Sequence, residues 1–90
     1  MQTVLSVTMI DNKLFDIKLE VAKHEGIHWA DRDMSPLYWY VNTGRASAEF
    51  LHKLFSVKPY LIARDILKGG TDEEIIDRIC KRIGCKRYEF

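Results

Sequence analysis

Cysteines and long apolar runs are both scarce in this 90-residue sequence. Two cysteines are too few for the disulfide framework of a small secreted domain, and Cys80 and Cys85 are not spaced as in C-x-x-C redox or zinc-ribbon motifs. No apolar stretch approaches the roughly 18 residues that a membrane-spanning helix needs. Residues 1–13 lack the basic region and continuous apolar run of a secretory signal. We therefore expect a cytoplasmic chain with reduced thiols and no membrane partner.

The sequence also lacks an excess of charge of one sign. Its 14 Lys and Arg residues nearly balance its 13 Asp and Glu residues, which leaves a formal net charge of +1. Apolar residues make up 47% of the chain, as in an ordinary globular protein. A chain of this length supports one small core, so we expect a single compact domain over residues 1–90.

What is present at the N-terminal end is an alternation of apolar and polar residues, which is typical of strands. Leu5, Val7 and Met9 alternate with polar residues, and so do Phe15, Ile17, Leu19 and Val21. We interpret the two runs as a β-hairpin with residues 11–13 as its loop. The aromatic and β-branched segment Leu37–Val41 follows Ser35-Pro36 and is predicted to be a third strand, with Trp39 on its apolar face.

From Asn42 onward the apolar residues are spaced as in helices. Pro59 suits the first position of one helix, and Gly69-Gly70 ends it. Thr71 and Glu74 form a capping-box pattern that starts the last helix, and Gly84 stops it, which would bring Cys80 and Cys85 together as the apolar pair of a Schellman motif. The sequence therefore predicts an α+β fold, in which two or three C-terminal helices pack on a small three-stranded antiparallel sheet. The predicted core comprises Leu5, Val7, Met9, Phe15, Ile17, Leu19, Trp39, Phe50, Leu54, Ile62, Ile66, Ile76, Ile79 and Ile83.

One motif carries catalytic chemistry. His24, Glu25 and His28 have the H-E-x-x-H spacing and resemble, over five residues, the zinc-binding motif of zincin proteases. The resemblance implies a zinc hydrolase with both histidines as ligands and Glu25 as general base; a metal site of other function would add Asp31 or Asp33 to the histidines. The chemistry needs a helix, but Gly26 and the absence of a clean apolar stripe favour a polar surface loop. We therefore expect no cofactor and no catalytic residues, and we keep the zinc hydrolase as an alternative.

Two binding functions remain. Large amphipathic side chains of the kinds enriched at protein interfaces gather in the middle of the chain, and they form the predicted partner surface: Trp29, Arg32, Met34, Tyr38 and Tyr40. By elimination, the leading hypothesis is a small protein-binding domain, an inhibitor, adaptor or regulatory subunit that acts by steric occlusion. The alternative is nucleic-acid binding through a basic cluster near the C-terminal end: Lys81, Arg82, Lys86 and Arg87. Exposed strand edges would also allow a homodimer.

Overall fold

The computed structural model describes residues 5–25 and 27–87, but not the side chains of residue 25 and residues 27–30. The described part consists of five helices and contains no strand, so the predicted α+β fold with a three-stranded sheet is wrong. The helices, in chain order, are α1 Val7–Glu25, α2 Ile27–Asn42, α3 Ala48–Phe55, α4 Pro59–Leu67 and α5 Asp72–Ile83.

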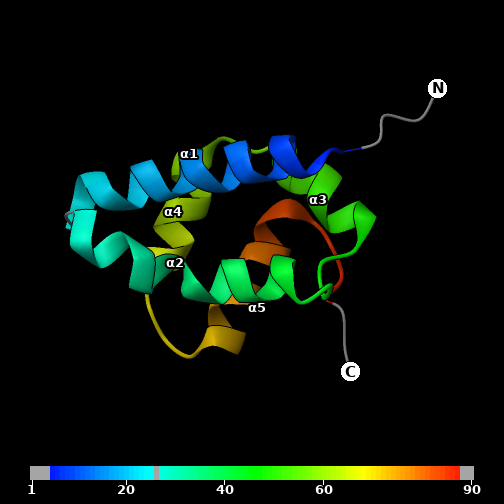
Figure 1. The fold of residues 1–90 in the computed structure, drawn as a ribbon. Coiled ribbons are helices and arrows are strands. Elements are labelled where there is room, and N and C mark those ends of the chain that lie inside the picture. The colour runs from blue at the N-terminus through cyan, green and yellow to red at the C-terminus, as the bar shows by residue number, and fades with distance from the viewer. Residues whose placement is uncertain (1–4, 26, 88–90) are drawn as a thin grey trace.

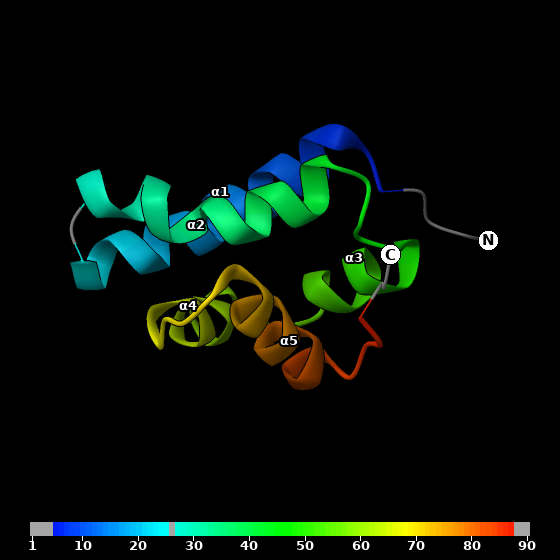
Figure 2. The ribbon, with the colours of Figure 1, turned by 90° about the horizontal axis from the view of Figure 1, so that it is seen from below.

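The helices form two layers (Figure 1). In the first layer α1 and α2 run antiparallel, and in the second α4 and α5 lie beneath them, as the view from below shows (Figure 2). The short α3 lies at one end of the second layer, where it contacts α5. Helix α1 packs against both α2 and α4, so it closes the core from one side.

Helix α1 occupies the region where the sequence predicted a hairpin. Ser6 caps its start by accepting a hydrogen bond of 3.1 Å from the backbone N–H of Met9. Leu14, Ile17 and Val21 follow the helical spacing i, i+3, i+7 and are all buried. The alternating pattern shares Ile17 and Val21 with this helical pattern, which is why it predicted strands. The expected loop at residues 11–13 contains no glycine to take a left-handed conformation, and the helix continues through it.

Helix α2 replaces the predicted third strand. In a strand Leu37 and Trp39 would share a face, but in a helix Leu37 lies on the same side as Met34 and Tyr40. These three residues are buried, whereas Trp39 is 42% exposed. Pro36, which was expected to precede a strand, lies inside α2. The prediction failed because packing of this helical face outweighs the strand propensity of aromatic and β-branched side chains.

The C-terminal half agrees with the sequence prediction. Pro59 stands in the first turn of α4, and Gly69 and Gly70 have positive φ after its end. In the capping box, the backbone N–H of Glu74 donates to the Thr71 hydroxyl (3.2 Å), and that of Thr71 donates to the Glu74 carboxylate (3.1 Å). Gly84 adopts the left-handed conformation, and the backbone N–H of Cys85 donates to the Cys80 carbonyl (2.9 Å). The Schellman motif and its pair of buried cysteines are therefore confirmed.

Of the fourteen predicted core residues, Leu5 is half-buried, and the others fall into two groups. Eight of them are buried: Ile17, Phe50, Leu54, Ile62, Ile66, Ile76, Ile79 and Ile83. Five others are exposed, contrary to prediction: Val7, Met9, Phe15, Leu19 and Trp39. All five precede α3. They are exposed because side chains on one face recur every 3.6 residues in the observed helices, and not every two residues as in the predicted strands.

Polar contacts fix the elements around this core. The ammonium of Lys13 on α1 donates to the Val57 carbonyl in the turn between α3 and α4. Burial lowers the pKa of Lys13, and the carboxylate of Asp16 partly opposes this effect. In the second layer, the buried carboxylate of Asp65 on α4 accepts two hydrogen bonds from Arg82 on α5. Lys13 therefore joins the first layer to the turn before α4, and Asp65 joins the two helices of the second layer.

Candidate functional site

The H-E-x-x-H motif spans the end of one helix and the beginning of the next. His24 is exposed in the last turn of α1. Residue 28 lies in the first turn of α2, which runs antiparallel to α1 (Figure 1). The side chains of Glu25, His28 and Trp29 lie outside the described residues. The polar loop expected for residues 22–33 is replaced by helix on both sides of residue 26, so the two histidines do not share the face of one helix.

The metal donors of the described residues do not converge. No group of three His, Cys, Asp or Glu side chains within the described ranges lies close enough to hold an ion. Asp31 forms an ion pair with Lys18 across the α1–α2 interface. This pair gives Asp31 a structural role between the two helices of the first layer.

The structure disperses the predicted partner surface. Met34 and Tyr40 are buried, and the Tyr40 ring lies 4.9 Å from that of Phe50, so both belong to the core. Arg32 is exposed and Tyr38 is half-buried beside Lys18, where burial raises the pKa of its phenol. Trp39, expected in the core, takes the exposed position instead, with the guanidinium of Arg45 4.5 Å from the centre of its ring.

The predicted basic cluster is partly neutralised. Arg82 is paired with the buried Asp65, and Arg87 contacts Asp77 at 2.8 Å and Glu73 at 3.7 Å. Lys81 and Lys86 are exposed and form no ion pair within residues 5–25 and 27–87. Only two of the four predicted cations are therefore available for contact with phosphates.

The most prominent apolar feature of the surface lies on α1. Phe15 is 54% exposed and Leu19 is 45% exposed, although both are large apolar side chains. With the half-buried Ala22 they follow the spacing i, i+4, i+7, so they share one face of the helix. We call Phe15, Leu19 and Ala22 the outer strip. Phe15 and Leu19 are exposed to solvent, whereas Ala22 is half-buried at the edge of the core, so the strip gives α1 a second apolar face beside its buried one.

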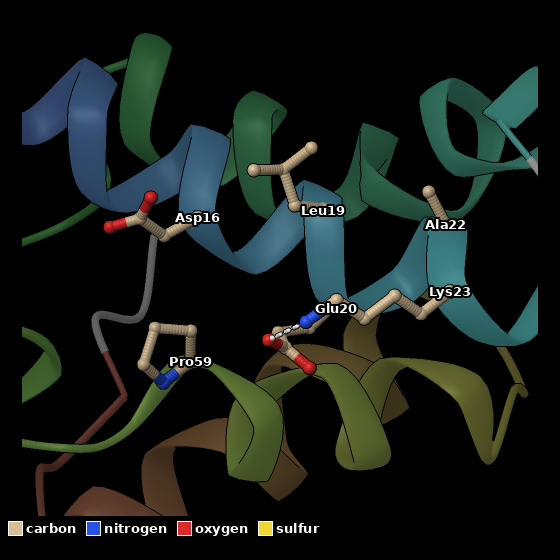
Figure 3. Close-up of a pocket in the computed structure, with 6 residues that line it drawn as sticks. All are labelled: Asp16, Leu19, Glu20, Ala22, Lys23 and Pro59. Carbon is tan, nitrogen blue, oxygen red and sulfur yellow. Dashed lines mark hydrogen bonds and ion pairs between the residues drawn. The ribbon is translucent and has the colours of Figure 1, made fainter.

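A groove between α1 and α4 continues the outer strip. Its volume is about 480 Å³, and the lining residues are Asp16, Leu19, Glu20, Ala22, Lys23 and Pro59. Figure 3 shows that Lys23 reaches back to Glu20, with which it forms an ion pair of 2.8 Å, while Pro59 closes the groove from α4. Leu19 and Ala22 belong to both features, so the outer strip and the groove form one continuous surface.

Acidic groups border this surface. Around the outer strip lie four carboxylates and three ammonium groups, a balance of −1: Asp11, Asp16, Glu20 and Asp31 with Lys13, Lys18 and Lys23. Lys18 and Lys23 are engaged in ion pairs, and the hydrogen bond that the Lys18 ammonium donates to the Asp31 carboxylate raises the pKa of Lys18. Asp11 and Asp16 take part in no ion pair or hydrogen bond within the described part of the chain. The border therefore presents the uncompensated charge of Asp11 and that of Asp16, which the buried ammonium of Lys13 offsets only in part because it also donates to the Val57 carbonyl.

Sequence reasoning missed the outer strip because Phe15 and Leu19 had been assigned to the core of a sheet. The signal that would have found it is the helical spacing of Leu14, Ile17 and Val21. Once these residues are placed inside, the period of 3.6 places Phe15 and Leu19 outside.

Comparison of the chain with protein-family models, with curated proteins and with solved structures finds no match. None of the helices in the described ranges combines the length and apolar character needed to cross a bilayer.

Proposed function

We propose that this protein is a small protein-binding domain, an adaptor, inhibitor or regulatory subunit, which docks a helix of its partner on the outer strip of α1 and acts by steric occlusion. The observation that carries the proposal is the exposure of Phe15 and Leu19 side by side on a helix whose opposite face already fills the core. Contiguous exposed apolar side chains with a polar border are typical of interaction sites.

A helix is the partner element that this surface suits best. The described residues form no sheet edge to which a partner strand could add, so a strand laid on α1 would leave its own backbone groups unpaired. A helix satisfies its backbone internally and presents apolar side chains at i, i+3, i+4 and i+7. The groove beside Leu19 offers space for one such side chain.

The proposal is tested by capture and crosslinking with matched variants. Leu19 and Tyr60 are each 45% exposed, but Tyr60 lies on α4 in the other layer. A photoreactive phenylalanine analogue at position 15 should crosslink a protein from an extract of the native host, and the same analogue at position 60 should not. Capture should be lost in Phe15→Ala/Leu19→Ala and retained in Tyr60→Ala, with circular dichroism showing that both variants are folded.

Other results would overturn this proposal. A crosslink from position 15 to a second copy of the chain, with a dimer in sedimentation that Phe15→Ala dissociates, would make the outer strip a self-association surface. Capture that survives Phe15→Ala/Leu19→Ala, or that nuclease treatment abolishes, would move the function to another surface or to nucleic acid.

A further inference from the structure

We infer that the docked helix is basic, carrying lysine or arginine on the two sides of its apolar face. The inference rests on the proposed function and adds the charge of the partner to it. Its basis is the acidic border of the outer strip, in a protein whose overall net charge is only +1. The local charge around this surface therefore differs in sign from that of the whole chain.

Two carboxylates supply the selectivity, one on each side of the strip. Asp16 lines the groove with Pro59, on the side of α1 that faces α4. Asp11 and Lys18 are spaced i, i+7 on α1, so Asp11 lies on the side that faces α2, where Lys18 pairs with Asp31. A helix lying along Phe15 and Leu19 therefore passes between two negative groups, and cations on both of its flanks are within reach of them.

The other charges of the border do not cancel this effect. Lys18 is held by Asp31 and Lys23 by Glu20, so each ammonium is already matched by a carboxylate. The buried ammonium of Lys13 opposes Asp16 only in part, because it also donates to the Val57 carbonyl. A partner with acidic flanks would therefore still meet the negative charges of Asp11 and Asp16 and would be repelled. By the same reasoning, an anionic lipid surface is a poor occupant of this face.

The experiment uses the full 90-residue chain and two synthetic helical peptides of about 18 residues, long enough to form helix in water. Both carry the same leucines at i, i+3, i+4 and i+7; one has lysines on the flanks and its twin has glutamates. Fluorescence anisotropy at low salt should show binding of the lysine peptide about tenfold tighter than that of its twin. The preference should shrink in about 1 M salt, where the Debye length is about 3 Å.

Substitutions locate the effect. Asp11→Asn/Asp16→Asn should reduce the preference to about threefold or less, whereas Asp72→Asn/Glu73→Gln, which makes the same change in net charge on α5, should leave it unchanged. Phe15→Ala should abolish binding of both peptides. Equal binding of the two peptides, lost in Phe15→Ala, would overturn the charge inference and leave the proposed function standing. Binding of neither peptide, or binding that is indifferent to Phe15→Ala, would count against both.

Discussion

Two leucines on α1 allow a direct test of the orientation of this helix. Leu14 is 1% exposed and faces the core, whereas Leu19, five positions later, is 45% exposed. The hairpin interpretation requires the reverse, because it places Leu19 inside with Phe15 and Ile17. The substitutions Leu14→Ala and Leu19→Ala remove the same atoms from the same helix. A difference between them therefore reports burial and not helix propensity.

The expected magnitudes follow from these exposed fractions. A buried Leu→Ala substitution costs about 2–5 kcal/mol, because the transfer free energy is lost and a cavity remains. We expect about 3 kcal/mol for Leu14→Ala. Leu19 buries about half of its side chain and leaves no closed cavity, so its substitution should cost about 1 kcal/mol or less. In a domain of this size, about 3 kcal/mol lowers the midpoint of thermal unfolding by roughly 12–24 °C.

Chemical denaturation followed by circular dichroism at pH 7 measures both differences in the free energy of unfolding. The slope of that free energy with denaturant should be the same for the two variants, which shows that they unfold from equally compact states. Equal costs for the two substitutions, or a larger cost for Leu19→Ala, would refute the helical orientation of α1.

Four further outcomes are expected in the second layer. Arg82→Met should lower the midpoint of thermal unfolding more than Arg87→Met, because the carboxylate partner of Arg82 is 1% exposed and those of Arg87 are 48% and 71% exposed; equal shifts would contradict this. Thr71→Ala should cost about 1 kcal/mol in denaturation at pH 7. Hydrogen bonds with the backbone N–H and hydroxyl of Thr71 lower the pKa of Glu74 from 4.5. The ionised Glu74 carboxylate therefore stabilises the fold above pH 4.5, and this stabilisation is lost as the pH falls through the lowered pKa. The Glu74→Gln variant should lack this acid dependence of the free energy of unfolding. Burial raises the pKa of the Cys80 thiol to about 11, so its labelling at pH 8, resolved by mass spectrometry, should be slow until denaturant is added; rapid labelling of the native protein would argue against a buried thiol.

The second layer was predictable because short-range interactions between neighbouring residues set the ends of its helices. Thr71 and Glu74 satisfy backbone groups within one turn, and Gly84 takes a conformation that other residues avoid. Such signals do not depend on the rest of the fold. The prediction of the Schellman pair Cys80 and Cys85 succeeded for the same reason.

The first layer was not predictable in this way, because one run of residues satisfies two periods. Phe15 and Leu19 complete a strand alternation with Ile17 and Val21, and only the competing helical spacing of Leu14, Ile17 and Val21 would mark them as exposed. Sequence rules are expected to fail where a residue serves binding in place of the core. The outer strip, as proposed, is such a place.

The same change of period separates the residues of the predicted partner surface. A strand would have placed Tyr38 and Tyr40 on one face, whereas in α2 they diverge, and Tyr40 enters the core. Arg32 is exposed, whereas Tyr38 is half-buried and packs against the edge of the core. Recognition of large amphipathic side chains was therefore not sufficient to locate the surface; their angular position on a helix was also needed.

The contacts of α1 and α5 have a consequence for folding during synthesis. The first helix covers α2 and α4, and the last helix packs against α2, α3 and α4. During synthesis, α1 and α2 become available early but can bury only part of their apolar surface against each other. The core closes when Ile76, Ile79 and Ile83 arrive. We therefore expect the nascent chain to stay vulnerable to proteolysis until α5 has left the ribosome, and then to become protected in a single step.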